Sequence, residues 1–234
     1  MKKELLIFGA YGALGQGVVQ TLIKRKYDKI FLFGSKDSKM QMFDAVNVEN
    51  IDSSNLSIES NVIDALGKVK PDKDKLLFLF SAIGGFTGGK YIWETEESEW
   101  DKMMEMNLKS SFFLAKYFAR IVKESAGGSI CFTSAYTGIH HESKKGAYGI
   151  SKSALNHLVK TLSVEGKEIN LSANVIAPYI IDTPANREWM ANGDYSKWIK
   201  PEEIGEIVGS IFDNYNTFNG NIIELKDRLT GTNQ

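Results

Sequence analysis

Short apolar runs alternate with longer segments of helical periodicity along almost the whole chain, and this alternation constrains the fold more than any other feature. Apolar runs of this length are typical of strands that a parallel sheet buries on both faces. The longer segments carry apolar residues three and four positions apart, as amphipathic helices do. The apolar runs lie at 4–10, 29–34, 75–82, 128–134, 172–178 and 220–225, with a weak one at 55–60, and the helical segments lie at 13–26, 97–125, 147–169 and 201–215.

Strands that alternate with helices at these lengths require right-handed crossovers, which place helices on both faces of a mostly parallel sheet. The chain has 234 residues, only four of them proline, and no internal repeat or Pro/Ser-rich linker divides it. We therefore expect an α/β fold, with a single doubly wound domain over residues 1–234 and a central sheet of about seven strands. The segment 36–55 lacks helical periodicity, so we expect the second crossover to contain a shortened helix or none.

Charge and apolar run length argue against two classes of partner. The chain carries 28 Lys and Arg against 29 Asp and Glu, a formal net charge of -1, so no global attraction draws it to nucleic acid or to an anionic membrane. No apolar run approaches the ~20 residues that span a bilayer. At the N-terminus, Glu4 and the glycines that follow favour a strand, turn and helix over a secretory signal. We expect no nucleic-acid or membrane partner.

Cys131 is the only cysteine in the chain, so no internal disulfide can form. No group of Cys and His has the spacing of a zinc site, and no metal site is predicted. This cysteine usage is typical of a reducing compartment, and we expect a cytoplasmic protein. Cys131 lies in the apolar run 128–134, where a small core residue is expected rather than a nucleophile.

The segment "LLIFGAYGALGQG" places its glycines directly after the first strand and at the start of the first helix. Glycine at these positions permits a tight turn, lets the backbone approach a pyrophosphate, and leaves helix N–H groups pointing at the anion. Glycines also serve simply to close a strand–helix turn, but the position in the first βα unit favours a dinucleotide site.

The residues after the second strand bear on the choice of nucleotide. An acidic residue there would bind a ribose 2′-hydroxyl and favour NAD. Here Gly34 is followed by Ser35 and Lys36, which suit a 2′-phosphate, and Asp37 comes only afterwards. We expect NADP(H) to be favoured, while NAD(H) stays open because Asp37 could still reach a ribose.

Tyr148 and Lys152 in "AYGISK" lie four positions apart, on one face of a helix. Such a pair can simply pack together. It can also supply the proton that carbonyl reduction requires, provided that the ordinary tyrosine pKa of ~10 is shifted. A neighbouring ammonium group favours the phenolate, so we expect Lys152 to lower the pKa of Tyr148.

With the glycine loop, "MNLKSS", "TSAYTG" and "YGISK" in their order, the chain resembles the short-chain dehydrogenase/reductase family over nearly its whole length. The resemblance implies a Rossmann domain and a catalytic set of Tyr148, Lys152, Ser134 and Asn107. Ser134 stands 14 residues before Tyr148, close to the usual interval. It would hydrogen-bond the substrate oxygen, Lys152 would hold the nicotinamide ribose, and Asn107 would anchor a proton-relay water. Ser134 and Asn107 could also serve only as a strand end and a helix kink.

The family resemblance and the glycine loop together give a set of expected cofactor contacts along the carboxyl edge of the sheet. Thr183 matches a common contact of the nicotinamide carboxamide. Tyr179 stands where the family usually has a glycine after Pro178. The expected contacts are Gly9, Tyr11, Gly12, Ala13, Leu14, Gly15, Ser35, Lys36, Ala82, Gly84, Lys152, Pro178, Ile181 and Thr183.

Within the family, three stretches resemble the dihydropteridine reductases: "GAYGALG", "GGFTGG" at 84–89 and "IDTPANREWM" followed by "DYSKW". The missing helix after the second strand fits as well. Two features depart from that group, namely Ser134 and the absence of an acidic residue directly after the second strand. A dihydropteridine reductase-like enzyme using NADH is therefore an alternative to an NADP(H)-dependent reductase of another small carbonyl compound.

Aromatic and long side chains gather in two segments expected near the substrate. A flat ring substrate is one interpretation, and lid packing or a subunit interface is the other. His140 and His141 are expected at the surface or in structural roles. The segments contribute Phe86 and Trp93 after the fourth strand, and Arg187, Trp189, Met190, Tyr195 and Trp198 between 183 and 200.

Three functions are compatible with this pattern. The first is reduction of a small carbonyl, or oxidation of the alcohol, by hydride transfer. The second is a non-catalytic NADP(H) sensor on the same fold, which would need only the glycine loop. A sugar-nucleotide epimerase shares the glycine spacing but needs a larger C-terminal domain than the 56 residues that follow Pro178. The family resemblance also implies a homodimer or homotetramer built on helices near 100–124 and 147–168.

Overall fold

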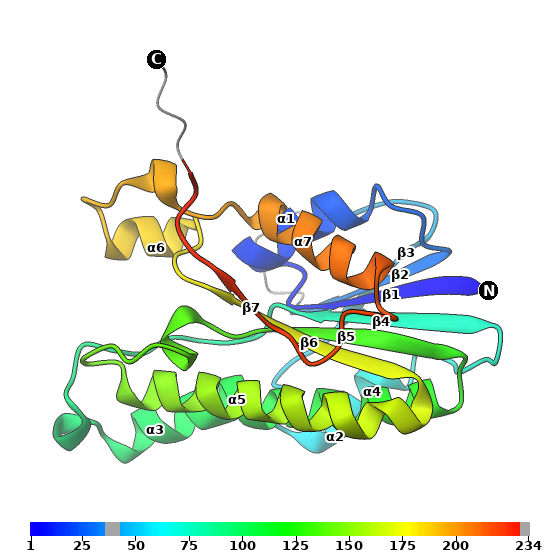
Figure 1. Ribbon diagram of the computed structural model, residues 1–234, viewed down its shortest axis with the longest axis horizontal. Coiled ribbons are helices and arrows are strands. Elements are labelled where there is room, and N and C mark those ends of the chain that lie inside the picture. The colour runs from blue at the N-terminus through cyan, green and yellow to red at the C-terminus, as the bar shows by residue number, and fades with distance from the viewer. Residues whose placement is uncertain (36–42, 230–234) are drawn as a thin grey trace.

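Seven parallel strands form one central sheet in the computed structural model, which describes residues 1–35 and 43–229 (Figure 1). The strand order is β3-β2-β1-β4-β5-β6-β7, so the order reverses between β1 and β4. This topology confirms the expected doubly wound Rossmann-type sheet. The strands are β1 (Lys2–Phe8), β2 (Lys29–Gly34), β3 (Val48–Asp52), β4 (Lys75–Ser81), β5 (Gly127–Thr133), β6 (Leu171–Pro178) and β7 (Ile222–Leu225).

Helices cover both faces of the sheet. In Figure 1, α1 and α7 lie above it, while α2, α3, α4 and α5 lie below, and α6 projects beyond the strands at the left. A π-helical turn, η2 (Glu105–Lys109), joins α3 to α4 without a break in the chain direction. The helices are α1 (Ala13–Leu22), α2 (Glu59–Leu66), α3 (Glu97–Met104), α4 (Ser110–Lys123), α5 (Gly146–Glu165), α6 (Pro184–Trp189) and α7 (Pro201–Asp213).

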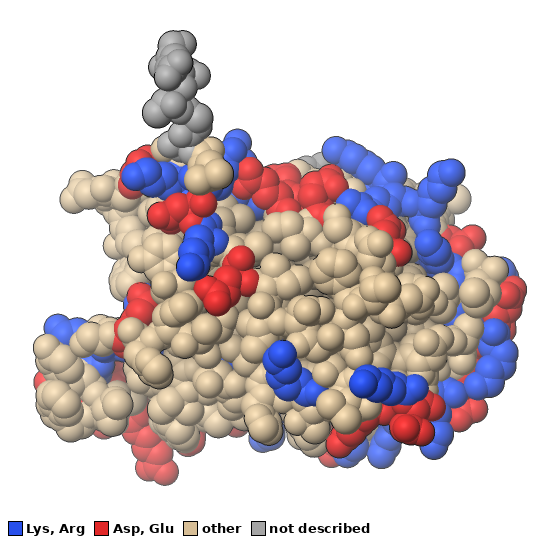
Figure 2. All heavy atoms as spheres, in the orientation of Figure 1, with Lys and Arg blue, Asp and Glu red and all other residues tan. Residues whose placement is uncertain are grey.

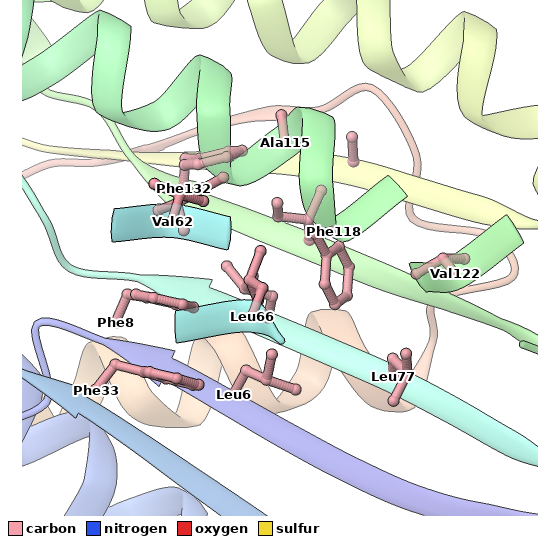
Figure 3. Close-up of a cluster of buried hydrophobic side chains, with 14 of the residues drawn as sticks. Leu6, Phe8, Phe33, Val62, Leu66, Leu77, Ala115, Phe118, Val122 and Phe132 are labelled. Atoms are coloured by element: carbon pink, nitrogen blue, oxygen red, sulfur yellow. The ribbon is translucent and has the colours of Figure 1, made fainter. Parts of the chain in front are cut away.

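Two apolar cores lie on the two faces of the sheet. Figure 3 shows the first, in which Phe8 and Phe33 stack with ring centroids 4.1 Å apart, beneath side chains of α2 and α4 such as Leu66 and Phe118. The second lies between the sheet and the pair α1 and α7. Burying both faces explains why the strand residues form nearly continuous apolar runs.

Two glycines allow α1 and α7 to cross closely. A Cβ atom at Gly17 would lie 2.3 Å from the Cβ of Pro201, and one at Gly205 would lie 2.7 Å from the Cβ of Thr21. These distances are shorter than any carbon–carbon contact in a packed core. The glycine at each position therefore sets how near the last helix comes to the first on this face of the sheet.

The expectation of a strand at 55–60 was wrong. The third strand is β3 at Val48–Asp52, and Glu59 already begins α2. β3 is an edge strand in which only Ile51 is buried, so it gives little apolar signal. Asn55, at φ 25°, accepts hydrogen bonds from the backbone N–H and the hydroxyl of Ser57, and this turn leads into α2.

The expected lack of a helix between 36 and 55 holds for residues 43–55, which contain turns and β3. Residues 36–42 lie outside the described part of the chain. Within the described residues, no helix has the length and apolar character needed to cross a bilayer.

Candidate active site

Two cavities lie at the carboxyl edge of the sheet, around the point where the strand order reverses between β1 and β4. This is the position at which open α/β sheets bind ligands. The first has a volume of about 650 Å³ and the second about 770 Å³. Leu14 lines the first cavity and Gly12 the second, so the glycine loop separates them. The edge faces left in Figure 1, and Figure 2 shows an indentation there, between the lobe with α6 and the lobe with α3.

The glycine loop turns from β1 into α1 with the backbone conformation expected of it. Gly9 has φ +76°, a left-handed conformation that side chains disfavour. A Cβ atom at Gly15 would lie 2.0 Å from the carbonyl oxygen of Gly9, so a larger residue cannot fit beneath the turn. Gly9 and Gly12 line the second cavity, whereas Ala13 and Gly15 line neither. The start of α1 thus faces the cavities with unhindered backbone, which suits a pyrophosphate.

Tyr11 reaches the second cavity but is mostly buried. Its ring packs so closely on the end of β2 that a Cβ at Gly34 would lie 2.5 Å from its Cδ2. Its hydroxyl donates a hydrogen bond of 2.7 Å to Oδ1 of Asn50 on β3. Burial, with a smaller contribution from Asp52, raises the pKa of this hydroxyl. Tyr11 therefore fixes the glycine loop to the edge strands as well as lining the cavity.

The structure brings three of the four expected catalytic residues into the first cavity. Ser134, immediately after β5, and Tyr148 and Lys152, in the first turns of α5, all line it. Ser134 Oγ donates to the carbonyl oxygen of Lys152 at 3.3 Å. Lys152 Nζ donates to the carbonyl oxygen of Thr133 at 2.8 Å and lies 5.9 Å from the centroid of the Tyr148 ring.

Asn107, the fourth expected residue, lies outside both cavities and is fully buried in the π-helical turn η2. Its Nδ2 donates to the carbonyl oxygen of Gly85 at 3.0 Å and to the hydroxyl of Ser151 at 3.0 Å, and its Oδ1 accepts from the N–H of Gly85 at 2.9 Å. These bonds connect the turn after β4 to α5. A Cβ atom at Gly84 would lie 2.9 Å from both Asn107 Oδ1 and Lys152 Nζ.

Burial controls the protonation of the tyrosine and the lysine. It lowers the pKa of Lys152 to about 7. Burial, together with the negative charge of Glu142, raises the pKa of Tyr148 above its ordinary value. The expectation that Lys152 lowers the tyrosine pKa is therefore wrong for this structure, because loss of hydration and the charge of Glu142 both raise that pKa.

The remaining expected cofactor residues differ in whether they line a cavity. Ala82, Gly84, Pro178 and Ile181 line the first cavity, and Ser35 lines the second. Thr183 lines neither, and its Oγ1 accepts from the N–H of Asn186 at 3.3 Å and caps α6. Lys36 lies outside the described residues. The two cavities on either side of an open glycine loop fit the two halves of a nicotinamide dinucleotide.

Only some of the aromatic and long side chains singled out in the sequence line the first cavity. Phe86 and Trp189 line the first cavity, with ring centroids 5.1 Å apart, and Phe86 also makes an edge contact with Tyr148. Met190 and Tyr179 line it as well. The others are engaged elsewhere: Trp93 stacks on Tyr91, Arg187 pairs with Asp182, Tyr195 packs on Trp198, and His140 bonds Glu224.

Sequence reasoning missed several residues that line the cavities. In the first, Thr137 comes from the short helix Tyr136–Gly138, Glu142 and Lys145 come from the loop between it and α5, and Asn186 comes from α6. In the second, residues 53–57 and Ser110 contribute polar groups. Glu142 lies close to Tyr148 in the sequence, and this closeness could have identified the loop as part of the cavity wall. Among the described residues, no group of three or more His, Cys, Asp or Glu is arranged to hold a metal ion.

Comparisons with known proteins agree with this geometry. A family model described as "short chain dehydrogenase" matches residues 3–194. A dihydropteridine reductase of Dictyostelium discoideum is 26% identical over 236 residues, which cover 98% of each chain. A tropinone reductase homolog of Arabidopsis thaliana is 27% identical and covers 88% of this chain and 83% of its own.

Solved structures share the fold. One described as ElxO with NADP bound has a TM-score of 0.82 at 19% identity, covering 96% of this chain and 97% of its own. A short-chain type dehydrogenase/reductase from Mycobacterium ulcerans has a TM-score of 0.83 at 18% identity, covering 95% and 87%.

Proposed function

Because this chain belongs to the short-chain dehydrogenase/reductase family, a family of NAD(P)-dependent oxidoreductases, we propose that it reduces a small carbonyl compound, or oxidises the corresponding alcohol, with NADP(H). The observation that carries the proposal is the meeting of Ser134, Tyr148 and Lys152 in one cavity beside the glycine loop. A sensor of the nucleotide would not need these three side chains together.

The reduction divides its tasks among these residues. A bound nicotinamide would supply the hydride. Ser134 donates a hydrogen bond to the substrate oxygen, and Tyr148 donates the proton that the developing alkoxide requires. With its pKa raised, the Tyr148 hydroxyl is protonated near neutral pH, as that of an ordinary tyrosine also is, so its proton is present for the reducing direction. Lys152, on the next turn of α5, holds the nicotinamide ribose, and Asn107 keeps the turn at Gly84 and Gly85 against α5.

Two observations support NADP(H) over NAD(H). Ser35 lines the second cavity directly after β2, where its hydroxyl suits a phosphate, and Lys36 follows it in the sequence. No acidic residue stands at the last position of β2, which is Gly34. The NADP named for one solved structure of the same fold agrees with this choice.

A dihydropteridine reductase-like activity with NADH is the second candidate. It is favoured by the Dictyostelium relative, which matches over 98% of this chain, and by the aromatic side chains of Phe86 and Trp189 on the cavity wall. Flat heterocycles stack well on such rings.

We also propose that residues 1–234 act as one domain, in the cytoplasm, as a homodimer or homotetramer. Exposed apolar side chains on two neighbouring helices support the assembly. Phe112 on α4 is 50% exposed and Ile150 on α5 is 46% exposed, and a second copy of the chain packed on these two helices would cover both side chains.

The first test measures NADPH and NADH consumption over a panel of carbonyl compounds that includes quinonoid dihydropterin. Tyr148→Phe removes only the hydroxyl, so we expect turnover to fall at least about 100-fold while cofactor affinity stays nearly unchanged. Tyr136→Phe is the matched control, because Tyr136 lies in the preceding segment and does not line the first cavity. Retention of most activity in Tyr148→Phe would contradict the assignment. Tight cofactor binding with no turnover on any compound would instead support the sensor.

A further inference from the structure

Glu142 and Lys145 are the two charged side chains of the first cavity that the proposed reaction does not use. Both come from the loop between η3 (Tyr136–Gly138) and α5, a few residues before Tyr148. The cavity lining otherwise consists of the reacting groups, apolar and aromatic side chains, small residues, and the polar Thr133, Thr137 and Asn186. A carboxylate in such a wall is a specific feature, because most of a ligand cavity is normally apolar.

The Glu142 carboxylate is held in one orientation by two donors. Its Oε1 accepts from Lys145 Nζ at 2.8 Å, and its Oε2 accepts from the hydroxyl of Thr137. Burial pushes the pKa of this carboxyl upward, but the hydrogen bonds from Lys145 and Thr137 outweigh it and hold the pKa below its ordinary value. Glu142 is therefore ionised near neutral pH, and an ionised carboxylate can only accept hydrogen bonds.

The ion pair alone does not explain why these residues face the cavity. The Lys145 and Glu142 side chains are 26% and 23% exposed, and partly exposed pairs contribute little to stability. Each carboxylate oxygen accepts one of these bonds and has a second lone pair to offer, while the ammonium group has further N–H donors. The pair thus presents an acceptor and a donor side by side, with no net charge.

This arrangement selects a particular kind of substrate edge. An anionic substrate would have to approach the carboxylate, and a cation would have to approach the ammonium group. A neutral edge with an N–H beside a carbonyl or ring nitrogen meets both partners, since the N–H faces Glu142 and the acceptor faces Lys145. Phe86 and Trp189, which are 43% and 59% exposed, offer rings to a flat body attached to that edge.

We propose that Glu142 determines the substrate specificity of this site, by binding the N–H of a lactam or aminopyrimidine edge on a planar heterocycle. The group to be reduced then lies at Ser134 and Tyr148, at the other end of the same ring system. Lys145 orients the carboxylate and binds the acceptor of that edge. This inference rests on the proposed function only in taking the first cavity as the substrate site.

The test compares two planar heterocycles that differ only at this edge. Lumazine carries ring N–H donors, and 1,3-dimethyllumazine has methyl groups in their place. Their dissociation constants are measured at equilibrium in the presence of NADP⁺, from the quenching of tryptophan fluorescence, to which Trp189 in the cavity contributes. We expect lumazine to bind at least about tenfold more tightly, as a hydrogen bond to a charged group implies.

The variant Glu142→Gln keeps the shape of the side chain and removes its charge. We expect it to weaken lumazine about tenfold or more and to leave 1,3-dimethyllumazine within about twofold. Glu188→Gln is the matched control, because Glu188 is an exposed acid on α6 that does not line the cavity. It should leave both constants unchanged.

Two results would overturn the proposal: equal affinity of the native chain for both ligands, or an equal loss for both in Glu142→Gln. The ligand pair decides the question with the native chain alone if the variant fails to fold. Since binding is measured without turnover, the specificity proposal and the reductase proposal can fail separately.

Discussion

Lys152 shows how much the surroundings of one side chain decide its chemistry. The side chain is 3% exposed, and its one hydrogen-bond partner among the described residues is the carbonyl oxygen of Thr133. Because that partner is neutral, burial lowers the pKa of Lys152 to about 7. Near neutral pH the residue can thus change protonation state, which an exposed lysine cannot. Tyr148 lies beside it with a pKa shifted in the opposite direction by the same loss of hydration.

The depressed pKa of Lys152 predicts a pH-dependent stability. Between about pH 7 and its ordinary value of 10.5, the unfolded chain binds a proton at this lysine that the folded chain does not. Raising the pH through this window therefore favours the folded state. We expect the free energy of unfolding of the cofactor-free chain to rise relative to that of Lys152→Met, by about 3 kcal/mol between pH 7 and 10.

Urea unfolding of both proteins across this pH range measures the difference, and the other titrating groups cancel because both chains contain them. A constant difference would mean that Lys152 keeps its ordinary pKa in the folded chain.

At the scale of elements, the π-helical turn η2 between α3 and α4 places an amide where a regular helix would not. Such turns are rare and are frequent at functional sites. Here η2 directs Asn107 at both backbone groups of Gly85 and at Ser151 on α5. Three elements, namely the turn after β4, η2 and α5, are thereby fixed relative to one another. The position of Lys152 and Tyr148 against the first cavity depends on this connection.

Replacement of Asn107 by alanine should therefore loosen the site as well as the fold. Asn107→Ala leaves the N–H and the carbonyl of Gly85 without their partners, and we expect a loss of about 2–3 kcal/mol in unfolding free energy. Turnover should fall with it, because the turn at Gly84 packs against Lys152.

The control is Ser111→Ala on α4, which is buried but makes a single bond to the carbonyl oxygen of Asn107 and should lose about 1 kcal/mol or less. Equal losses in the two variants would show that Asn107 is an ordinary buried amide.

At the scale of the whole molecule, charged groups are unevenly spread. Figure 2 shows a broad tan area in the middle of this face, broken by a few blue and red groups, with more Lys, Arg, Asp and Glu toward its edges. Phe112 and Ile150 are exposed on α4 and α5. Apolar groups on the long helices favour burial against a second copy of the chain.

The assembly predicts a change in size when a charge is placed there. We expect Phe112→Glu to convert the native oligomer to a smaller species, measured by light scattering after size-exclusion chromatography, since a buried unpaired carboxylate opposes association. Ile63→Glu on α2 is the control, because Ile63 is also exposed, at 46%, and lies outside the predicted interface. An unchanged mass for Phe112→Glu, or an equal effect of both, would contradict this interface.

The central part of the fold was predictable from the sequence, for a physical reason. β1, β2, β4, β5 and β6 lie inside the sheet, so their residues form the apolar runs that the sequence displays, as Leu5 to Phe8 do with no exposure at all. β3 lies at the edge and buries only Ile51, and the alternation at 55–60 imitated a strand where a turn begins α2. A short sequence pattern cannot distinguish an edge strand from the turn that begins α2, because the burial of these residues depends on which other segments pack on the edge of the sheet.

The sequence by itself determined the alternating fold, the glycine loop and the spacing that brings Ser134, Tyr148 and Lys152 into one cavity, since each depends on residues close in the chain or on strand order. Only the tertiary structure decided the rest. The inward position of Glu142, the bonds of Asn107 to Gly85 and the opposite pKa shifts of Tyr148 and Lys152 depend on burial by segments distant in sequence. Hydration is lost only when those segments meet, so no local pattern contains it.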